Sequence, residues 1–211
     1  MFALPTLLFF FATGAAARPT QQLPLSASRL ALFGGDVPWN ASRWLAVDDR
    51  VRGGSSQSHL TAIPGSNSAL FSGILDTKTL GGAGFASQRA VPTSSVSWDL
   101  SAWDGIELVT VKEDGKRYAL NLMSDLGPRR PDGRVESTIE YKYSFDSNPA
   151  GAGAARSIQW ADFSAFYRGR PVPDASPIDP ARIAAISIMC QSYFAQQDGP
   201  FELEISSVAA V

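Results

Sequence analysis

Hydrophobic and polar residues alternate with a period of two along much of this chain. From Ile139 to Phe145, isoleucine, tyrosine and phenylalanine alternate with glutamate, lysine and serine, and a similar alternation runs from Phe201 to Ile205. A period of two places one face of a strand in a core and the other in water, so Lys142 is expected to face water. Residues 69–76 alternate as well, whereas 184–190 is more uniformly apolar, as expected of a strand covered on both faces. These segments predict β-strands.

Turn-forming residues separate the predicted strands. An Asp-Gly step at 114–115 lies between two strand-like segments and predicts a β-hairpin. Glycines and prolines predict loops at 127–135, 147–156 and 170–180. The best helical candidate, 179–183, has aspartate as its N-cap and proline at the first helical position, and it would form a single turn. Short strands without a long amphipathic helix favour an all-β fold, an antiparallel β-sandwich or jelly roll.

Length and composition fit one ordinary globular domain, which we place at residues 31–211. The chain has 211 residues, of which 45% are hydrophobic and 18% charged. A net charge of -2 gives no electrostatic reason to expect a nucleic acid or an acidic membrane as partner. Cys190 is the single cysteine, so no intramolecular disulfide can form, and its place at the end of an apolar run predicts a core residue.

Residues 1–30 are predicted to be a leader or tail outside the fold. The apolar run at 7–12, followed by alanines at 15–17, resembles a secretory signal with its cleavage site. It is too short to span a membrane, which takes about 20 apolar residues. No acidic residue precedes Asp36 and arginines are present, which is also typical of mitochondrial import sequences. Both destinations stay open; in a secreted protein Asn40-Ala41-Ser42 would accept a glycan, and otherwise it forms a turn.

The segment VDDRVRGGSSQSHL, residues 47–60, has the composition of a reactive site but lacks the necessary partners. A serine nucleophile needs a base and zinc needs three or four ligands, yet His59 is the sole histidine of the chain. Asp48 and Asp49 would point to opposite faces of a strand, which makes them a poor acid–base pair. We therefore expect one aspartate to brace the following turn and the other to be solvated, although calcium would also suit these carboxylates.

A glycine pair in the same segment is interpreted as a turn. Gly53 and Gly54 let the backbone turn where a Cβ would clash, which predicts that Gly53→Val destabilises the fold. Neither catalytic residues nor a metal or cofactor site is expected in the chain.

Two further motifs suggest binding sites but have simpler interpretations. The segment GGAGFAS, residues 81–87, lacks the third glycine and the following helix of a phosphate-binding loop, so its glycines are expected to permit positive φ and close packing before a strand. Five tryptophans would suit a sugar-stacking platform. Since Trp98 and Trp103 flank a turn, we expect instead that the tryptophans pack at the edge of the core with each indole N–H satisfied.

The order of several short motifs resembles the complex I intermediate-associated protein 30 family. Each motif is weak alone, but together and in the family's order they cover most of the chain, from Leu32 to Val208. They are LFGG from Leu32, WLAVDDRVRGGSSQS from Trp44, ALFSGILDT from Ala69, GGAGFASQR ending at Arg89, then WDLSAWDGIELVTVKEDGKRYALNL, YKYSF, WADFSAFYRGR, and IAAISIMC with DGPFELEI.

This resemblance implies a galactose-binding-like jelly roll and a non-enzymatic assembly factor. Such a protein is a chaperone that binds protein intermediates of mitochondrial NADH:ubiquinone oxidoreductase, respiratory complex I, and it carries no cofactor. The alternative is a carbohydrate- or ligand-binding jelly-roll module of the secretory pathway. Under the assembly-factor interpretation the mature domain does not insert stably into a membrane. Its partner surface is expected to include Asp48, Asp49, Arg50, Gly53, Gly54, Ser56, Gln57, Ser58 and Arg89.

Overall fold

The computed structural model describes residues 29–94, 96–131 and 135–211, which form strands and three short 3-10 helices. The predicted leader lies outside the described residues except for its last two positions, so the division at residue 30 stays a prediction. The first sheet contains β1 (Leu30–Gly34), β3 (Gln57–Ala62), β4 (Ala69–Leu75), β6 (Gly105–Lys112), β9 (Ala155–Gln159) and β13 (Gly199–Ala210). The second contains β2 (Trp44–Ala46), β5 (Phe85–Ala90), β7 (Arg117–Met123), β8 (Glu140–Asp146), β10 (Ser164–Tyr167), β11 (Arg170–Pro171) and β12 (Ala185–Gln191). The 3-10 helices are η1 (Ala41–Arg43), η2 (Asp49–Arg52) and η3 (Trp160–Asp162).

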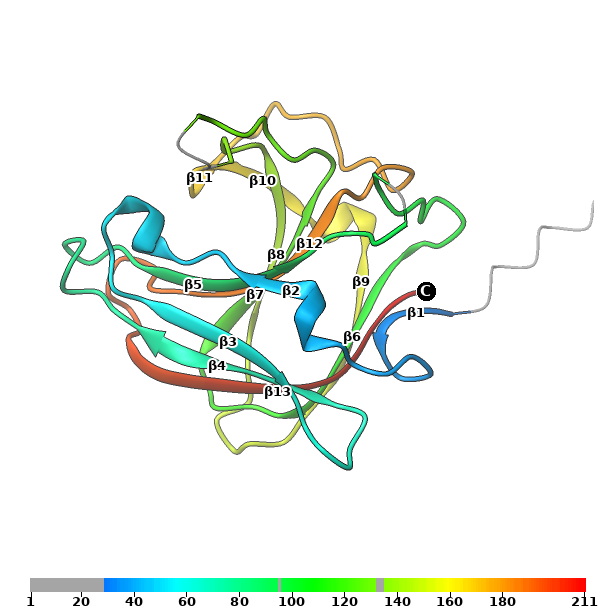
Figure 1. Ribbon diagram of the computed structural model, residues 1–211, viewed down its shortest axis with the longest axis horizontal. Coiled ribbons are helices and arrows are strands. Elements are labelled where there is room, and N and C mark those ends of the chain that lie inside the picture. Colours follow the sequence, from blue (N-terminus) through cyan, green and yellow to red (C-terminus); the bar gives the residue numbers. More distant parts are fainter. Residues whose placement is uncertain (1–28, 95, 132–134) are drawn as a thin grey trace, which may run out of the picture.

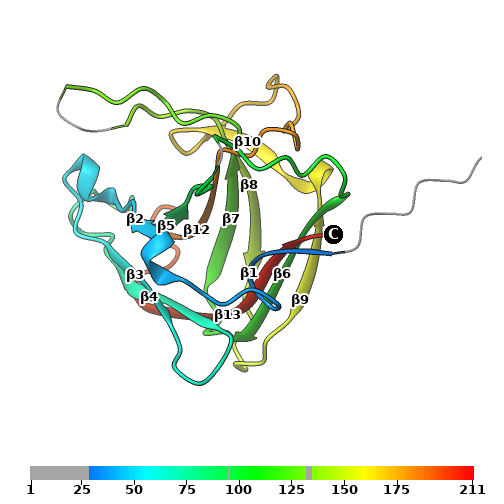
Figure 2. The same cartoon turned by 45° about the vertical axis from the view of Figure 1, so that its right-hand side comes forward.

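Two antiparallel sheets pack face to face with the hydrophobic core between them (Figures 1 and 2). The first sheet has the order β3-β4-β13-β6-β9, with β1 also paired to β13, and the second has the order β11-β10-β8-β7-β12-β5-β2. Consecutive strands often lie in different sheets, as in a jelly roll. The prediction of an all-β antiparallel sandwich is confirmed.

The period-two alternation identified the core-facing residues correctly in most strands. Phe201, Leu203 and Ile205 of β13 are buried, and β12 is buried along nearly its whole length, as its uniformly apolar sequence predicted. Lys142 of β8 departs from the prediction, because its side chain is buried on the outer face of the sheet. Its Nζ donates to Oε1 of Gln191 at 2.6 Å and lies over a phenylalanine ring, so neighbouring side chains cover it where water was expected.

The predicted hairpin at Asp114-Gly115 is wrong, although both of its strands exist. β6 belongs to the first sheet and β7 to the second, so residues 113–116 connect the two sheets instead of joining paired strands. Glu113 anchors this connection, because its buried carboxylate lies 2.6 Å from Nη1 of Arg156 and accepts from Oγ1 of Thr110 at 2.6 Å. The Asp-Gly step makes the expected turn, but long-range pairing decides which sheet each strand joins.

The helical candidate 179–183 is a hydrogen-bonded turn and not a helix. Arg182 N donates to Asp179 O at 3.0 Å, and Ile183 already forms an extended bridge with Trp98. Among the described residues no helix has the length and the apolar character needed to cross a membrane. Cys190 is fully buried, and burial raises the pKa of its thiol to about 12, as befits a core residue.

The tryptophans pack against the core edge and form no exposed platform. Phe33 is the centre of one aromatic cluster, with ring centroids 5.9 Å from Trp39, 4.7 Å from Trp44 and 6.1 Å from Trp98. Trp39 donates its indole N–H to Ser206 O at 3.0 Å, as expected. The indole N–H of Trp44 is buried without a hydrogen-bond partner among the described residues, which contradicts the expectation that every indole N–H is satisfied.

Candidate functional site

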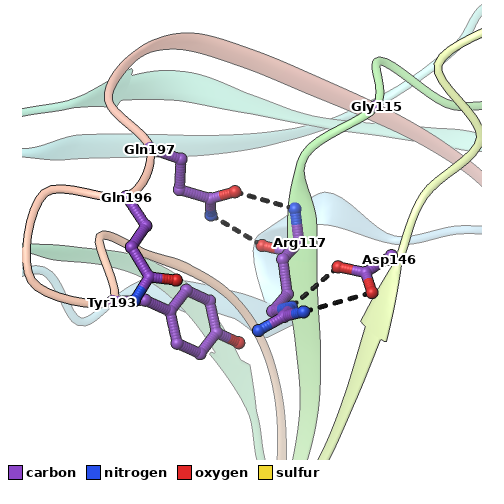
Figure 3. A pocket seen from close by; sticks show the side chains of 6 residues that line it. All are labelled: Gly115, Arg117, Asp146, Tyr193, Gln196 and Gln197. Atoms are coloured by element: carbon purple, nitrogen blue, oxygen red, sulfur yellow. Dashed lines mark hydrogen bonds and ion pairs between the residues drawn. The ribbon is translucent and has the colours of Figure 1, made fainter.

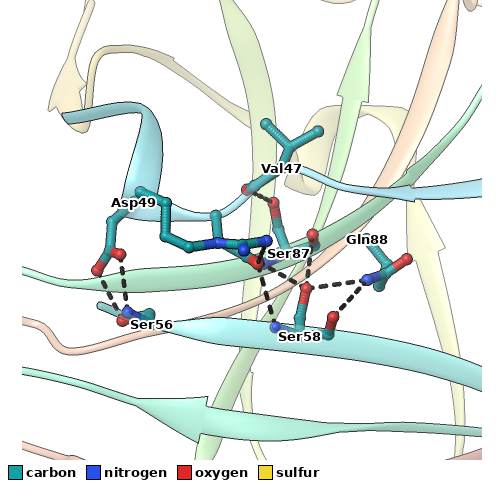
Figure 4. Close-up of polar contacts among 8 residues, drawn as sticks. Val47, Asp49, Ser56, Ser58, Ser87 and Gln88 are labelled. Atoms are coloured by element: carbon teal, nitrogen blue, oxygen red, sulfur yellow. Dashed lines mark hydrogen bonds and ion pairs between the residues drawn. The ribbon is translucent and has the colours of Figure 1, made fainter. Parts of the chain in front are cut away.

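Asp49, the first residue of η2, is a buried residue that bridges the two sheets. Its carboxylate accepts hydrogen bonds from Ser56 N at 3.0 Å and from Ser56 Oγ at 2.6 Å (Figure 4), and also from Phe85 N at 3.2 Å. Ser56 leads into β3, the edge strand of the first sheet, and Phe85 begins β5, next to the edge of the second. One carboxylate therefore satisfies backbone donors from both sheets.

Asp48 repeats this arrangement two residues further along both strands. Its carboxylate accepts from Ser58 N at 3.2 Å, from Ser58 Oγ at 2.6 Å and from Ser87 N at 3.0 Å. The guanidinium of Arg50 lies 3.3 Å from its Oδ2 and is itself largely exposed. Because N–H groups of an edge strand point the same way at every second residue, two adjacent aspartates can satisfy two such donors on each strand.

These contacts define a carboxylate seam, formed by Asp48, Asp49, Ser56, Ser58 and the backbone of β5. The seam joins β3, the edge strand of the first sheet, to the start of β5 in the second sheet, and no direct backbone ladder forms between these two strands. The expectation that one aspartate is solvated is wrong, since both are buried and both point into the seam. The chain enters a 3-10 helix at Asp49 and abandons the strand alternation, so both carboxylates face the same way.

The glycine pair after η2 is required for two different reasons. Gly53 ends η2 in the left-handed region, with φ at +85°, and a Cβ there would meet nothing within 4 Å. Gly54 has a permitted backbone, but a Cβ there would lie 2.3 Å from Oδ1 of Asp49. Only the second glycine therefore avoids a clash; the first avoids backbone strain.

Substitutions at the two glycines are expected to have different costs. Gly53→Val should lower the free energy of unfolding by roughly 1–3 kcal/mol through its positive φ alone. Gly54→Ala should cost more, because its methyl group displaces Asp49 from Ser56 and Phe85. Urea denaturation of both variants measures this, with Gly65→Ala as a control at another exposed positive-φ glycine without neighbours. A Gly54→Ala variant as stable as the wild type would contradict the close packing of the seam.

The candidate partner-binding residues divide into a buried and an exposed group. Asp48, Asp49, Ser56 and Ser58 are buried and are not available to a partner in this conformation. Exposed positions follow the outer side of the segment, and half-buried Arg89 lies on the outer face of β5, opposite Ser187 of β12. The exposed positions are Arg50, Val51, Arg52, Gly53, Ser55 and Gln57, with Gly54 half-buried.

A second loop, residues 192–198, lies beside this segment and was not identified from the sequence. Tyr193, Phe194 and Ala195 all have positive φ, at 45°, 57° and 64°, a conformation that non-glycine residues rarely adopt. Phe194 is 85% exposed. Three successive left-handed residues carry no local sequence signal, because none is glycine, asparagine or aspartate.

Hydrogen bonds at both of its ends hold the 192–198 loop. Ser192 donates its N–H to Gly84 O at 2.9 Å and its hydroxyl to Gly82 O at 2.8 Å. The amide of Gln197 pairs with the backbone of Arg117, accepting from its N at 2.8 Å and donating to its O at 2.8 Å (Figure 3). The strained turn is thus fixed by its surroundings, as strained functional loops are.

A shallow pocket of about 180 Å³ lies between this loop and the start of β7 (Figure 3). Arg117 forms a two-point ion pair with Asp146, with Nε–Oδ1 at 2.7 Å, and its guanidinium lies 5.1 Å from the ring centroid of Tyr193. The hydrogen bond from Arg117 holds the pKa of Asp146 below its usual range, while burial raises the pKa of Tyr193. These groups are mutually satisfied, so the pocket serves mainly to support the loop.

We use the name loop end for three connected segments, residues 49–56, 76–84 and 192–198. The first two meet where Thr79 Oγ1 donates to Ser55 Oγ at 3.0 Å, and Ser192 joins the second to the third. Gly81 and Gly82 have positive φ and precede β5, which confirms the structural interpretation of the GGAGFAS segment. Within the described part of the chain, no group of three or more His, Cys, Asp or Glu residues is placed to hold a metal ion.

Comparison with known proteins identifies the family. The model of the complex I intermediate-associated protein 30 family matches residues 33–205. The chain belongs to this family. An uncharacterised protein of Schizosaccharomyces pombe is 40% identical over 185 residues, which covers 86% of this chain and 84% of that protein.

Two solved structures with a similar fold are carbohydrate-binding modules. The family 11 carbohydrate-binding module of the cellulosomal cellulase Lic26A-Cel5E of Clostridium thermocellum covers 86% of this chain and 94% of its own, with a TM-score of 0.55 and 14% identity. The family 11 module from the same organism in complex with a β-1,3-1,4-mixed-linked tetrasaccharide gives a TM-score of 0.56 at 13% identity, over 86% of this chain and 95% of its own. At these identities the similarity shows the fold alone.

Proposed function

We propose that this member of the complex I intermediate-associated protein 30 family is a non-enzymatic assembly factor. It binds protein intermediates of respiratory complex I in the mitochondrion, and the loop end is its binding surface. Family membership over residues 33–205 supports the assembly role. One structural observation supports placing the binding surface at the loop end. Phe194 is 85% exposed there, on a turn that hydrogen bonds hold in a strained conformation.

The loop end has the composition of a protein-binding surface. A rigid exposed aromatic residue can enter a pocket on a partner without losing much conformational entropy, and aromatic and arginine residues dominate binding energy at interfaces. Val51, 48% exposed, and the exposed Arg50 and Arg52 lie on the neighbouring η2. These charges favour an acidic partner surface. The buried aspartates contribute indirectly, because the seam holds η2 in place.

A deletion strain of the source organism tests this function. Deletion should reduce the amount of assembled complex I on native gels, and the wild-type gene should restore it. Phe194→Ser should fail to restore it, since losing a central aromatic contact weakens binding roughly thirty-fold. Val96→Ser is the matched control, because Val96 is 92% exposed and follows β5 at the opposite end of the sandwich.

Thermal melts of both variants should match the wild type, since neither residue packs in the core. Normal amounts of complex I in the deletion strain, or full rescue by Phe194→Ser, would count against the proposal.

The second candidate function is a secreted carbohydrate- or ligand-binding module. It is favoured by a pocket of about 420 Å³ whose lining includes Tyr141, Tyr167 and Ser124, the last with a buried hydroxyl that has no hydrogen-bond partner among the described residues. Tyrosine rings and free hydroxyls suit sugar rings. Cleavage after Ala17 and a glycan on Asn40, whose side chain is exposed and caps η1, would support this function. N-terminal sequencing of the mature protein together with a glycan array separates it from the assembly factor.

A further inference from the structure

A row of polar residues crosses the outer face of the seven-stranded sheet. Cross-strand pairing places Lys142 of β8 opposite Asn121 of β7, Asn121 opposite Ser187 of β12, and Ser187 opposite Arg89 of β5. Their sequence neighbours face the core, so these four side chains share the other face. The four strands lie side by side in Figure 2. The row puts a cation at each end and small or neutral residues in the middle.

The cations around this row outnumber the carboxylates. Glu140 lies two residues before Lys142 on β8 and therefore on the same face of the sheet. Its carboxylate interacts electrostatically with Lys142, Arg89 and Arg52. Burial lowers the pKa of Arg89 and of Lys142, and it raises the pKa of Glu140. Three cations thus face one carboxylate, and two of them, Arg89 and Lys142, lie in surroundings that hold little water, whereas Arg52 is exposed. Positive charge exceeds negative charge there.

The middle of the row contains an acceptor without a donor. Asn121 is fully buried, and its Oδ1 has no hydrogen-bond partner among the described residues. Its Nδ2 reaches only the sulfur of Met189, at 3.8 Å. Buried polar atoms are almost always satisfied, so such an atom points to a missing donor. In the described part of the chain, the guanidinium of half-buried Arg89 likewise has no hydrogen bond or ion pair, whereas the Nζ of Lys142 already donates to Gln191.

Two alanines and two methionines, Met123 and Met189, flank the middle of the row on the same face. Ala119 and Ala185 lie on the same outer face, next to Asn121 and Ser187 along their strands. Arg52 is exposed, and its guanidinium lies 5.4 Å from the ring centroid of Phe85. Arg52 therefore lies on the β5 side of this face, where it is open to solvent.

We propose that this outer face binds a small anion that also carries a hydroxyl group, such as a sugar acid or a sugar phosphate. The carboxylate or phosphate lies between Arg89 and Lys142, and the hydroxyl donates to Oδ1 of Asn121. Glu140 is the internal counterion that the anion partly displaces. The residues proposed to contact the anion, Arg89, Lys142 and Asn121, lie outside the loop end, and the proposal does not depend on the assembly function.

Calorimetric titration of the purified protein with three probes and one neutral control tests the proposal. Glucuronate and glucose 6-phosphate should bind, inorganic phosphate should bind more weakly because it lacks the sugar hydroxyls, and glucose should not bind detectably. The first two probes distinguish a carboxylate from a phosphate ligand. Affinity should fall as salt increases, as expected for charge-assisted binding.

Substitutions distinguish this site from unspecific charge attraction. Arg89→Gln should weaken binding about ten-fold, and Glu140→Gln should tighten it about three-fold, because the competing carboxylate is gone. Asn121→Leu should remove the preference for glucose 6-phosphate over inorganic phosphate. Lys112→Gln, which removes an exposed cation from the other sheet, should leave the affinity unchanged.

Two outcomes would overturn the proposal. One is the absence of measurable heat with all three anions on a protein whose thermal melt shows that it is folded. The other is an equal loss of affinity in Arg89→Gln and Lys112→Gln. Tighter binding by Glu140→Gln supports a local site, since loss of structure does not raise affinity.

Discussion

Asp49→Ala is expected to lower the free energy of unfolding by roughly 3–5 kcal/mol. The substitution removes three hydrogen bonds and leaves the N–H groups of buried Ser56 and half-buried Phe85 without their carboxylate acceptor. Each buried donor left unpaired costs about 1–3 kcal/mol. Since a domain of this size is stable by only about 5–15 kcal/mol, the loss takes much of its stability.

Urea denaturation measures this effect, with Asp174→Ala as the control. Asp174 is exposed and should change stability by less than about 0.5 kcal/mol. The stability of Asp49→Asn should lie between those of the wild type and Asp49→Ala. The amide oxygen still accepts a hydrogen bond, but the NH₂ group that replaces the other carboxylate oxygen faces donors and cannot accept from them. An Asp49→Ala variant that unfolds at the wild-type urea concentration would show that the seam contributes nothing to stability.

Arg156→Met is expected to cost a similar amount, roughly 3–5 kcal/mol, because it breaks a buried ion pair from one side. The side chain of Glu113 has no exposed surface and that of Arg156 is 15% exposed, with 2.6 Å between Nη1 and Oε1. Without the guanidinium, the carboxylate keeps its hydrogen bonds from Thr110 and Asn148 but loses its opposite charge. The connection between the sheets then carries an uncompensated buried charge.

The pH dependence of this variant is a sharper test than its stability at one pH. Burial alone would raise the pKa of Glu113, but hydrogen bonds from Arg156, Thr110 and Asn148 hold it below its usual value of 4.5. Because the pKa of Glu113 is lower in the folded state than in the unfolded state, the ionised carboxylate stabilises the folded wild type at pH values above 4.5. This contribution is lost as the pH falls through the pKa of the folded state. In Arg156→Met burial should dominate and raise the pKa, so protonation at lower pH relieves the buried charge.

The stability difference between Arg156→Met and the wild type should therefore shrink between pH 7 and pH 5. Thermal or urea denaturation at both pH values measures it, with Arg117→Met as the control for an exposed ion pair. A difference that stays constant or grows on acidification would contradict the assignment of Glu113 as a buried charged partner.

Local sequence patterns predicted the sheets better than their connections. The alternation at Phe201, Leu203 and Ile205 follows directly from one face meeting the core, and it identified β13. The Asp-Gly step at 114–115 indicates a turn, but it carries no information on pairing. β6 finds its partners in β13 and β9, far away in the sequence, and those contacts place it in the other sheet from β7.

The candidate site shows a similar division. Asp48 and Asp49 were recognisable as unusual, but their role depends on backbone donors of β3 and β5 that only the folded chain brings together. The exposed loop at Phe194 could not be predicted at all. Hydrogen bonds with Gly82 and Arg117 hold its left-handed backbone. The residue types of the loop do not predict this conformation.

The central claim is that the seam shapes the loop end and that a complex I intermediate binds there. Photo-crosslinking tests it most directly, with p-benzoylphenylalanine placed at residue 194 in the full chain and, as the control, at residue 96. After illumination of isolated mitochondria, residue 194 is predicted to crosslink to a complex I subunit within an assembly intermediate, and residue 96 is not. The claim would be contradicted if the protein is imported into mitochondria but residue 194 forms no crosslink to a complex I subunit. Equal crosslinking from residues 194 and 96 would also contradict it.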